Sequence, residues 1–123
     1  MKLLYISTFM FHKDEQCTFA LPSCADGFFG KYLEVFSSVR VLGEEIKAYL
    51  DKSALVEMMD PNIQVRILPA NTNPKDFVND RKIRKLLTEE ISAAEAILIK
   101  PATRRGMMAI KIAEIFPFIS SVY

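Results

Sequence analysis

The chain has 123 residues, of which 50% are hydrophobic and 25% charged, and its formal net charge is +1. This length suits one domain, and the composition excludes an intrinsically disordered chain, which combines low hydrophobicity with a large net charge. A near-neutral chain is also unlike a general nucleic-acid-binding protein. No apolar run approaches the ~20 residues of a membrane-spanning helix. These properties indicate one globular domain.

The chain opens with a short apolar run, Leu3–Ser7, which is typical of a strand buried on both faces of a sheet. The apolar part of a signal peptide looks similar, so secretion is the alternative. We expect a cytoplasmic protein, because the amino terminus carries one basic side chain, Lys2, and polar residues interrupt the apolar run that a signal peptide would need. The cysteines, Cys17 and Cys24, are too few for a disulfide framework and are expected to be free thiols.

The segment from Thr8 to Ala25 is predicted to be a long loop. Loops beyond ~12–15 residues in a compact domain are usually functional. Its candidate ligand contacts are His12 and Lys13, which could touch an anion or a sugar hydroxyl. The alternative is an exposed loop whose phenylalanines fold back against the domain.

Strand and helix patterns then alternate. Strands are predicted at Val39–Leu42, Ile63–Leu68, Ala96–Lys100 and Phe118–Tyr123, and helices at Asp26–Phe36, Asp80–Ala94 and Arg104–Ile115. The stretch Glu44–Met59 fits either a helix or a loop. Alternation of this kind predicts an α/β domain with a mainly parallel sheet of about five strands. Because such sheets bind ligands at the carboxyl ends of their strands, chemistry is expected after Ser7 and after Lys100.

The segment after Lys100 is basic. It continues with Thr103, Arg104, Arg105 and Gly106 at a predicted helix start. Free backbone amides and the helix dipole attract anions there, whereas unpaired arginines oppose the dipole. The sequence therefore predicts a phosphate or carboxylate site, with two solvated arginines as the alternative. No cofactor and no metal is expected, since neither a glycine-rich nucleotide loop nor a metal-ligand spacing is present.

Three stretches together resemble the retaining glycosyltransferases of the GT-B fold, the glycogen-synthase-like superfamily. Lys2–Lys13 (KLLYISTFMFHK) resembles their opening strand and loop. Gly27–Leu42 (GFFGKYLEVFSSVRVL) is similar to the first helix and second strand of a bacterial subgroup. Ala96–Val122 (AILIKPATRRGMMAIKIAEIFPFISSV) resembles a strand, a small-residue turn, a glycine, a helix, a proline and a strand.

The resemblance implies one Rossmann-like, three-layer domain over residues 1–123, the N-terminal acceptor-side half of an enzyme that transfers a sugar from a nucleotide sugar. It implies a nucleotide-sugar donor, a sugar or lipid-linked acceptor and a C-terminal donor domain, which the sequence lacks. The isolated chain is therefore expected to be inactive and to self-associate, and no nucleic-acid partner is expected. Lys100 stands where the family often has arginine, and Gly106 keeps the family's glycine at the helix start.

Two positions depart from the family pattern. Asp14-Glu15-Gln16 replaces the glycine-rich turn after the first strand, and Gly43 stands where an arginine often follows the second strand. Glycines let a backbone approach a phosphate closely, so their replacement weakens the case for phosphate contact at that turn. The alternative function is a small stand-alone α/β module that binds a ligand or another protein.

Overall fold

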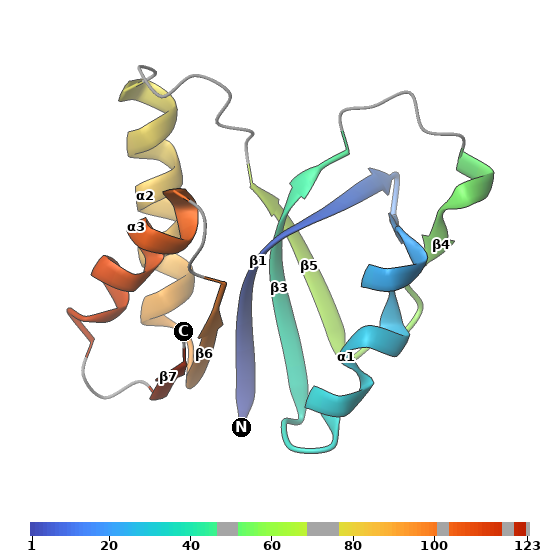
Figure 1. Ribbon diagram of the computed structural model, residues 1–123, viewed down its shortest axis with the longest axis horizontal. Helices are drawn as coiled ribbons and strands as arrows, with labels where there is room; N and C mark the ends of the chain where they lie inside the picture. Colours follow the sequence, from blue (N-terminus) through green and yellow to red (C-terminus); the bar gives the residue numbers. More distant parts are fainter. Residues whose placement is uncertain (47–51, 69–76, 101–103, 117–119, 123) are drawn as a thin grey trace.

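The computed structural model describes residues 1–46, 52–68, 77–100, 104–116 and 120–122, with the backbone alone at 52, 77–80, 104–105 and 120–122. In this part of the chain seven strands form one sheet (Figure 1). The strands are β1 (Lys2–Asp14), β2 (Cys17–Ala20), β3 (Ser38–Glu45), β4 (Val56–Glu57), β5 (Ile63–Leu68), β6 (Ala96–Ile99) and β7 (Ser120–Val122). The α-helices are α1 (Asp26–Leu33), α2 (Phe77–Ser92) and α3 (Arg104–Ala113), and short 3-10 helices span Pro22–Cys24 and Lys52–Ala54.

The sheet is mixed. β1 runs parallel to β3 and β6, β3 parallel to β5, and β6 parallel to β7. β2 runs antiparallel to β1, and β4 antiparallel to β2. The prediction of a mainly parallel, Rossmann-like sheet of about five strands is therefore wrong. The difference arises in two places. The segment predicted to be a long loop contains β2, which pairs antiparallel with β1, and the stretch Glu44–Met59 contains β4, which pairs antiparallel with β2.

That segment forms a hairpin. β1 does not end at Ser7 but continues to Asp14, and its second half pairs with β2 so that Phe11 lies opposite Ala20. Both side chains are fully buried, so the hairpin is part of the core. The turn between the strands places Glu15 at a φ of 52°, a left-handed conformation that glycine or asparagine usually adopts. Because neither residue is present, the sequence lacks the usual hairpin signal.

β1 bulges where its two halves meet. Ile6 pairs with Leu42 and Met10 with Glu44, so β1 uses two more residues than β3 over this step. The Ser7 hydroxyl donates to the Leu42 carbonyl at 3.0 Å and accepts from the Phe9 amide at 3.2 Å, which fixes the bulge. Gly43 lies inside β3 opposite this bulge, and does not follow the strand as predicted.

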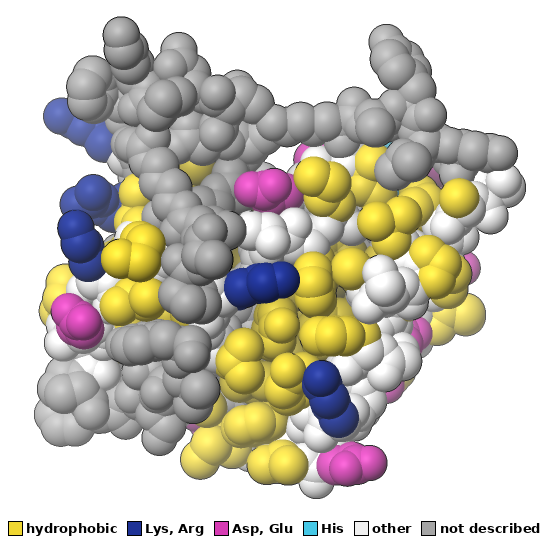
Figure 2. All heavy atoms as spheres, in the orientation of Figure 1, with side chains coloured by type: hydrophobic (Ala, Val, Ile, Leu, Met, Phe, Trp, Pro, Cys, Tyr) yellow, Lys and Arg dark blue, Asp and Glu magenta, His cyan; other side chains and the backbone are white. Residues whose placement is uncertain are grey.

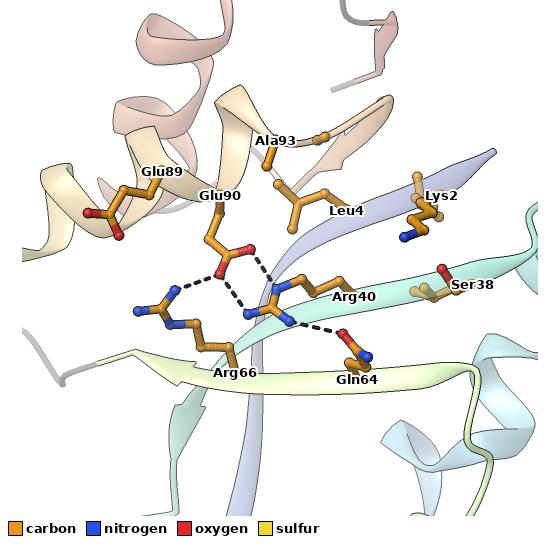
Figure 3. Close-up of a pocket in the computed structure, with 12 residues that line it drawn as sticks. Lys2, Leu4, Ser38, Arg40, Gln64, Arg66, Glu89, Glu90 and Ala93 are labelled. Carbon is orange, nitrogen blue, oxygen red and sulfur yellow. Dashed lines mark hydrogen bonds and ion pairs between the residues drawn. The ribbon is translucent and has the colours of Figure 1, made fainter.

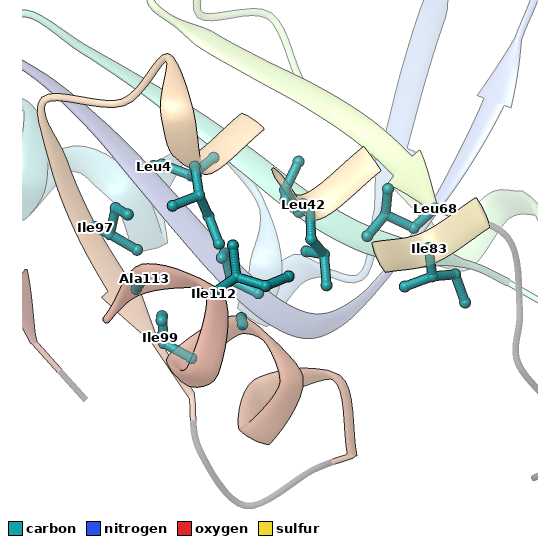
Figure 4. Close-up of a cluster of buried hydrophobic side chains, with 12 residues drawn as sticks. Leu4, Leu42, Leu68, Ile83, Ile97, Ile99, Ile112 and Ala113 are labelled. Carbon is teal, nitrogen blue, oxygen red and sulfur yellow. The ribbon is translucent and has the colours of Figure 1, made fainter. Parts of the chain in front are cut away.

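Alternate side chains of β1 fill two cores on opposite faces of the sheet. On one face, Leu4 and Ile6 pack with residues of α2 and α3, as Figure 4 shows. On the other face, Leu3 and Tyr5 pack with Phe29 of α1 and with residues of β3 and the hairpin. This alternation is the period of two that a strand buried on both faces requires.

Several predicted elements lie where the sequence placed them. β5 has the predicted bounds, and α2, α3 and β7 fall at the predicted positions with shifted ends. Glu44–Met59 is not one helix: β3 runs to Glu45 and β4 lies near the end of the stretch, with 47–51 outside the described residues. α1 begins at the predicted residue, Asp26, and Ala25 holds the N-cap position. The Asp26 carboxylate accepts hydrogen bonds from the backbone amides of Met59 and Asp60 at 2.7 and 3.1 Å.

Candidate functional site

Lys100 lies at the carboxyl end of β6, beside the β1 bulge. Its backbone amide donates to the carbonyl of Ile6 at 3.1 Å, and its exposed side chain places Nζ 5.6 Å from the ring centroid of Phe9. The segments after Ser7 and before the predicted anion site therefore meet at this edge of the sheet. An ammonium over an aromatic face is attracted by the negative potential of the ring.

Phe9 belongs to an aromatic cluster, which we define as Tyr5, Phe9, Phe28, Phe29 and Tyr32 from β1 and α1. The rings of Phe9 and Phe28 meet edge to face with centroids 5.0 Å apart, and those of Tyr5 and Phe9 stack at 5.8 Å. Tyr5 and Phe29 are buried, whereas Phe9, Phe28 and Tyr32 are only partly buried. Figure 2 shows hydrophobic side chains gathered over the part of this face where α1 and the sheet lie, with Lys or Arg side chains among them.

A second lysine flanks the aromatic cluster. Lys31 of α1 places Nζ 4.7 Å from the ring centroid of Phe28 and 5.1 Å from that of Tyr32. At the base of the cluster, burial raises the pKa of Tyr5 to about 12, and the neighbouring Tyr32 adds to the rise. The Tyr5 hydroxyl is therefore protonated at neutral pH and cannot serve as a base. The cluster offers partly exposed ring faces next to two ammonium groups.

His12 and Lys13 lie on the hairpin, away from the start of α3. Beyond the bulge, β1 bends across the top of the molecule and carries both residues away from α3 (Figure 1). The Nδ1 atom of His12 lies 3.5 Å from a carboxylate oxygen of Glu45, and Lys13 is exposed. The structure does not bring these two residues to the predicted anion site.

The predicted anion site itself is only partly described. Thr103 lies outside the described residues, and Arg104 and Arg105 are the first residues of α3, with side chains outside the described part. Gly106 is buried in the first turn of that helix. The helix start agrees with the prediction, and the anion site stays a prediction.

A pocket that the sequence did not predict lies at the amino-terminal side of the sheet (Figure 3). It has a volume of about 440 Å³ and lies between α2 and the first residues of β1 and β3. Two arginine side chains of its lining converge on Glu90 of α2, which is 8% exposed. Arg40 of β3 holds both carboxylate oxygens of Glu90, with its Nε donating at 2.6 Å and a terminal nitrogen at 2.8 Å. Arg66 of β5 donates to the same carboxylate at 2.7 Å.

This arrangement fixes the charge of Glu90. Burial alone would raise the pKa of the carboxyl, but the hydrogen bonds from Arg40 and Arg66 outweigh it and lower the pKa. The hydrogen bond to Glu90 in turn raises the pKa of Arg40. The carboxylate is thus ionised at neutral pH and ties α2 to two strands of the sheet. We interpret the pocket as a structural ion-pair network, because its strongest donors are already engaged within the protein.

The sequence holds a signal for this network that depends on strand register. Arg40 and Leu42 share one face of β3, and the pairing of Leu42 with Arg66 brings the second arginine to that face. Glu90 lies three and seven residues after Leu87 and Ile83 on the buried stripe of α2. Neither observation points to the network without knowledge of which strands are neighbours.

No described helix combines the length and apolar character needed to cross a membrane. No protein-family model matches the chain, and no curated protein matches its sequence. Among solved structures, the C-terminal domain of a hydrogenase from Pyrococcus furiosus is similar at 13% identity and a TM-score of 0.40. That match covers 98% of this chain and 88% of the hydrogenase domain. A likeness at this TM-score carries no argument about fold or function.

Proposed function

We propose that the chain is the acceptor-side domain of a glycosyltransferase and that it holds a sugar-bearing, anionic ligand on the aromatic cluster beside Lys100. The observation that carries the proposal is the position of the Lys100 ammonium group, 5.6 Å from the ring centroid of the partly buried Phe9, at the carboxyl end of β6. The resemblance of Lys2–Lys13 and Ala96–Val122 to glycosyltransferase segments supports the reaction class.

The chemistry of the aromatic cluster fits such a ligand. The C–H face of a sugar ring packs against aromatic faces, and a lysine ammonium binds phosphate as a mobile point charge. Lys31 places its ammonium group over Phe28 and Lys100 over Phe9, so each of these partly exposed rings has a positive charge nearby. In sheets with parallel strands, ligands bind at the carboxyl ends, which is where Lys100 and the β1 bulge lie. This domain would supply binding and orientation of the acceptor.

The proposal is tested by titrating the isotope-labelled chain with glycosyl phosphates and following the amide and aromatic resonances by NMR. The probes are glucose, mannose, galactose and N-acetylglucosamine 1-phosphates, with methyl glucoside and inorganic phosphate as part-ligands. At least one glycosyl phosphate should bind more tightly than either part-ligand, with shifts at Phe9 and Lys100. Lys100→Met should weaken that binding at least fivefold, because it removes the charge and keeps most of the stem.

The matched control is Lys82→Met, since Lys82 is an exposed lysine on α2 outside the cluster. The Lys82→Met variant should bind the glycosyl phosphate as tightly as the unchanged chain does. Binding that survives both Lys100→Met and Phe9→Leu would place the ligand elsewhere. In a separate titration with UDP, tight binding without any contribution from a sugar would favour a stand-alone nucleotide-binding module.

We also propose a cytoplasmic location. Cys17 and Cys24 are both free, which fits a reducing compartment. A hydrogen bond with Glu57 raises the pKa of the exposed Cys17 thiol, so the thiol stays in its less reactive protonated form. Both thiols, including the buried Cys24, should react with a maleimide in denaturant in protein taken from cells without reduction, and a Cys17–Cys24 disulfide would argue against this location.

A further inference from the structure

A groove runs between α2 and α3 on the outer side of the helical layer. It has a volume of about 400 Å³ and is lined by Arg84, Thr88, Met107, Met108, Lys111, Ile112 and Ile115. The two helices pack against each other and against the sheet, so the groove is a fixed feature of their contact. It lies on the opposite face of the sheet from the aromatic cluster and plays no part in the proposed sugar site.

The groove has an apolar lining that is partly open to solvent. Met107 is 52% exposed and Ile115 71%, while Met108 and Ile112 lie deeper. Isolated exposed apolar residues are ordinary, but here they lie together in one concave surface. Methionine side chains are flexible and polarisable, which lets such a surface adapt to a partner's apolar side chains. A groove this open leaves much of a small ligand in water, whereas small-molecule sites usually enclose ~70–90% of theirs.

The rim of the groove is basic. Arg84 and Lys111 line it from the two helices, and both are exposed. Arg81 and Lys85 are also exposed and lie within one helical turn of Arg84 and Thr88 on α2. Among the described side chains, the acidic Glu114 follows Lys111 by three residues, just after α3. Figure 2 shows the same pattern along the edge of the molecule where α2 and α3 lie, with Lys and Arg side chains beside hydrophobic ones.

We infer that this groove docks an acidic amphipathic helix of a partner protein. An amphipathic helix presents apolar side chains at positions i, i+3 or i+4, and i+7 to a groove of this kind. Leucine or phenylalanine side chains would pack on Met107, Met108 and Ile115, and flanking carboxylates would pair with Arg84 and Lys111. The charge of the rim selects an acidic partner over a basic one and speeds the encounter.

The test is an unbiased selection of displayed 16-residue peptides on the full chain, followed by affinity measurements with labelled peptides. Enriched peptides should be acidic with apolar residues at helical spacing, and should gain helix on binding. Ile115→Asp and Lys111→Glu should each weaken binding at least tenfold, and added salt should weaken it further. The matched controls are Val35→Asp, at a site that is 76% exposed on the other side of the molecule, and Lys82→Glu on α2. Both controls should bind as the unchanged chain does.

Other occupants of the groove would give distinct results. Enriched peptides that are basic or lack helical periodicity would overturn the inference. So would binding that Ile115→Asp and Lys111→Glu leave intact. Cosedimentation with phosphatidylserine vesicles that Ile115→Asp abolishes would assign the face to membranes instead. Dimers in analytical ultracentrifugation that the same variant dissolves would assign it to a second copy of the chain.

Discussion

Gly43 lies at a closely packed point of the sheet. An ideal Cβ at this position would lie 2.5 Å from two ring carbons of Phe11 and 2.7 Å from the carbonyl oxygen of Phe9. Phe11 is fully buried and the Phe9 carbonyl belongs to the bulge, so neither neighbour can move easily. The bulge in β1 and the glycine in β3 therefore depend on each other.

Gly43→Ala should consequently lower the free energy of unfolding by about 1–3 kcal/mol, the usual range for overpacking a core. Denaturation with urea measures the change. The control is Gly30→Ala in α1, where a Cβ meets nothing within 4 Å. That variant should be more stable by about 0.5–1 kcal/mol, because alanine favours a helix over glycine. A Gly43→Ala protein as stable as the parent would mean that the bulge can relax.

The helix α2 is held by charge as well as by apolar packing. Its Ile83, Leu87 and Ile91 are fully buried against the sheet, and Glu90 adds the bonds to Arg40 and Arg66. Removing one partner of a fully buried ion pair costs about 3–5 kcal/mol. Here the two arginine side chains are 41% and 36% exposed, so water compensates for part of the loss.

Glu90→Gln should therefore lower the free energy of unfolding by about 1–2 kcal/mol at neutral pH. Because the folded protein lowers the pKa of Glu90, its stabilisation is present above the ordinary value of 4.5 and is lost as the pH falls through the folded pKa. The difference between the parent and Glu90→Gln should thus shrink below pH 4.5. The neighbouring exposed Glu89 provides the control, and Glu89→Gln should change stability by less than about 0.5 kcal/mol. An equal effect of both variants would show that the ion pairs of Glu90 with the two arginines add nothing to the free energy of unfolding.

The elements that the sequence predicted well are those whose own residue pattern identifies them. β5 alternates apolar and polar residues, and α2 repeats apolar residues at helical spacing, so each could be identified without its neighbours. The hairpin could not, because its turn uses Glu15 in a left-handed conformation and no glycine marks it. The sequence predicted chemistry after Ser7 and after Lys100, and the parallel pairing of β1 with β6 brings Ser7 and Lys100 to the same edge of the sheet. The Arg40–Glu90–Arg66 network depends on the register of β3 with β5 and on the docking of α2, and neither is encoded in any one segment.

At the scale of the whole molecule, the sheet joins the two cores. β1 supplies Leu4 and Ile6 to the core under α2 and α3, and Leu3 and Tyr5 to the core under α1. β3 and β6 likewise contribute to both sides. Loss of either core would leave one face of these strands exposed to water, so we expect neither core to persist alone. A domain of this size usually unfolds in one cooperative step.

Two probes can follow the two cores separately. Tyrosine fluorescence reports on the α1 side, where Tyr5 and Tyr32 lie, in a background carrying Tyr49→Phe and Tyr123→Phe. Far-UV circular dichroism reports mainly on the other side, because α2 and α3 have 16 and 10 residues against 8 in α1.

Leu87→Ala, in the core under α2, should lower the free energy of unfolding by about 2–5 kcal/mol. The free energy of unfolding should fall by the same amount in both signals, although Leu87 lies across the sheet from both tyrosines. As the control, Val35→Ala at an exposed position should change the free energy of unfolding by no more than about 0.5 kcal/mol in either signal. A fluorescence transition that stays in place while the helical signal moves would show two units that unfold independently.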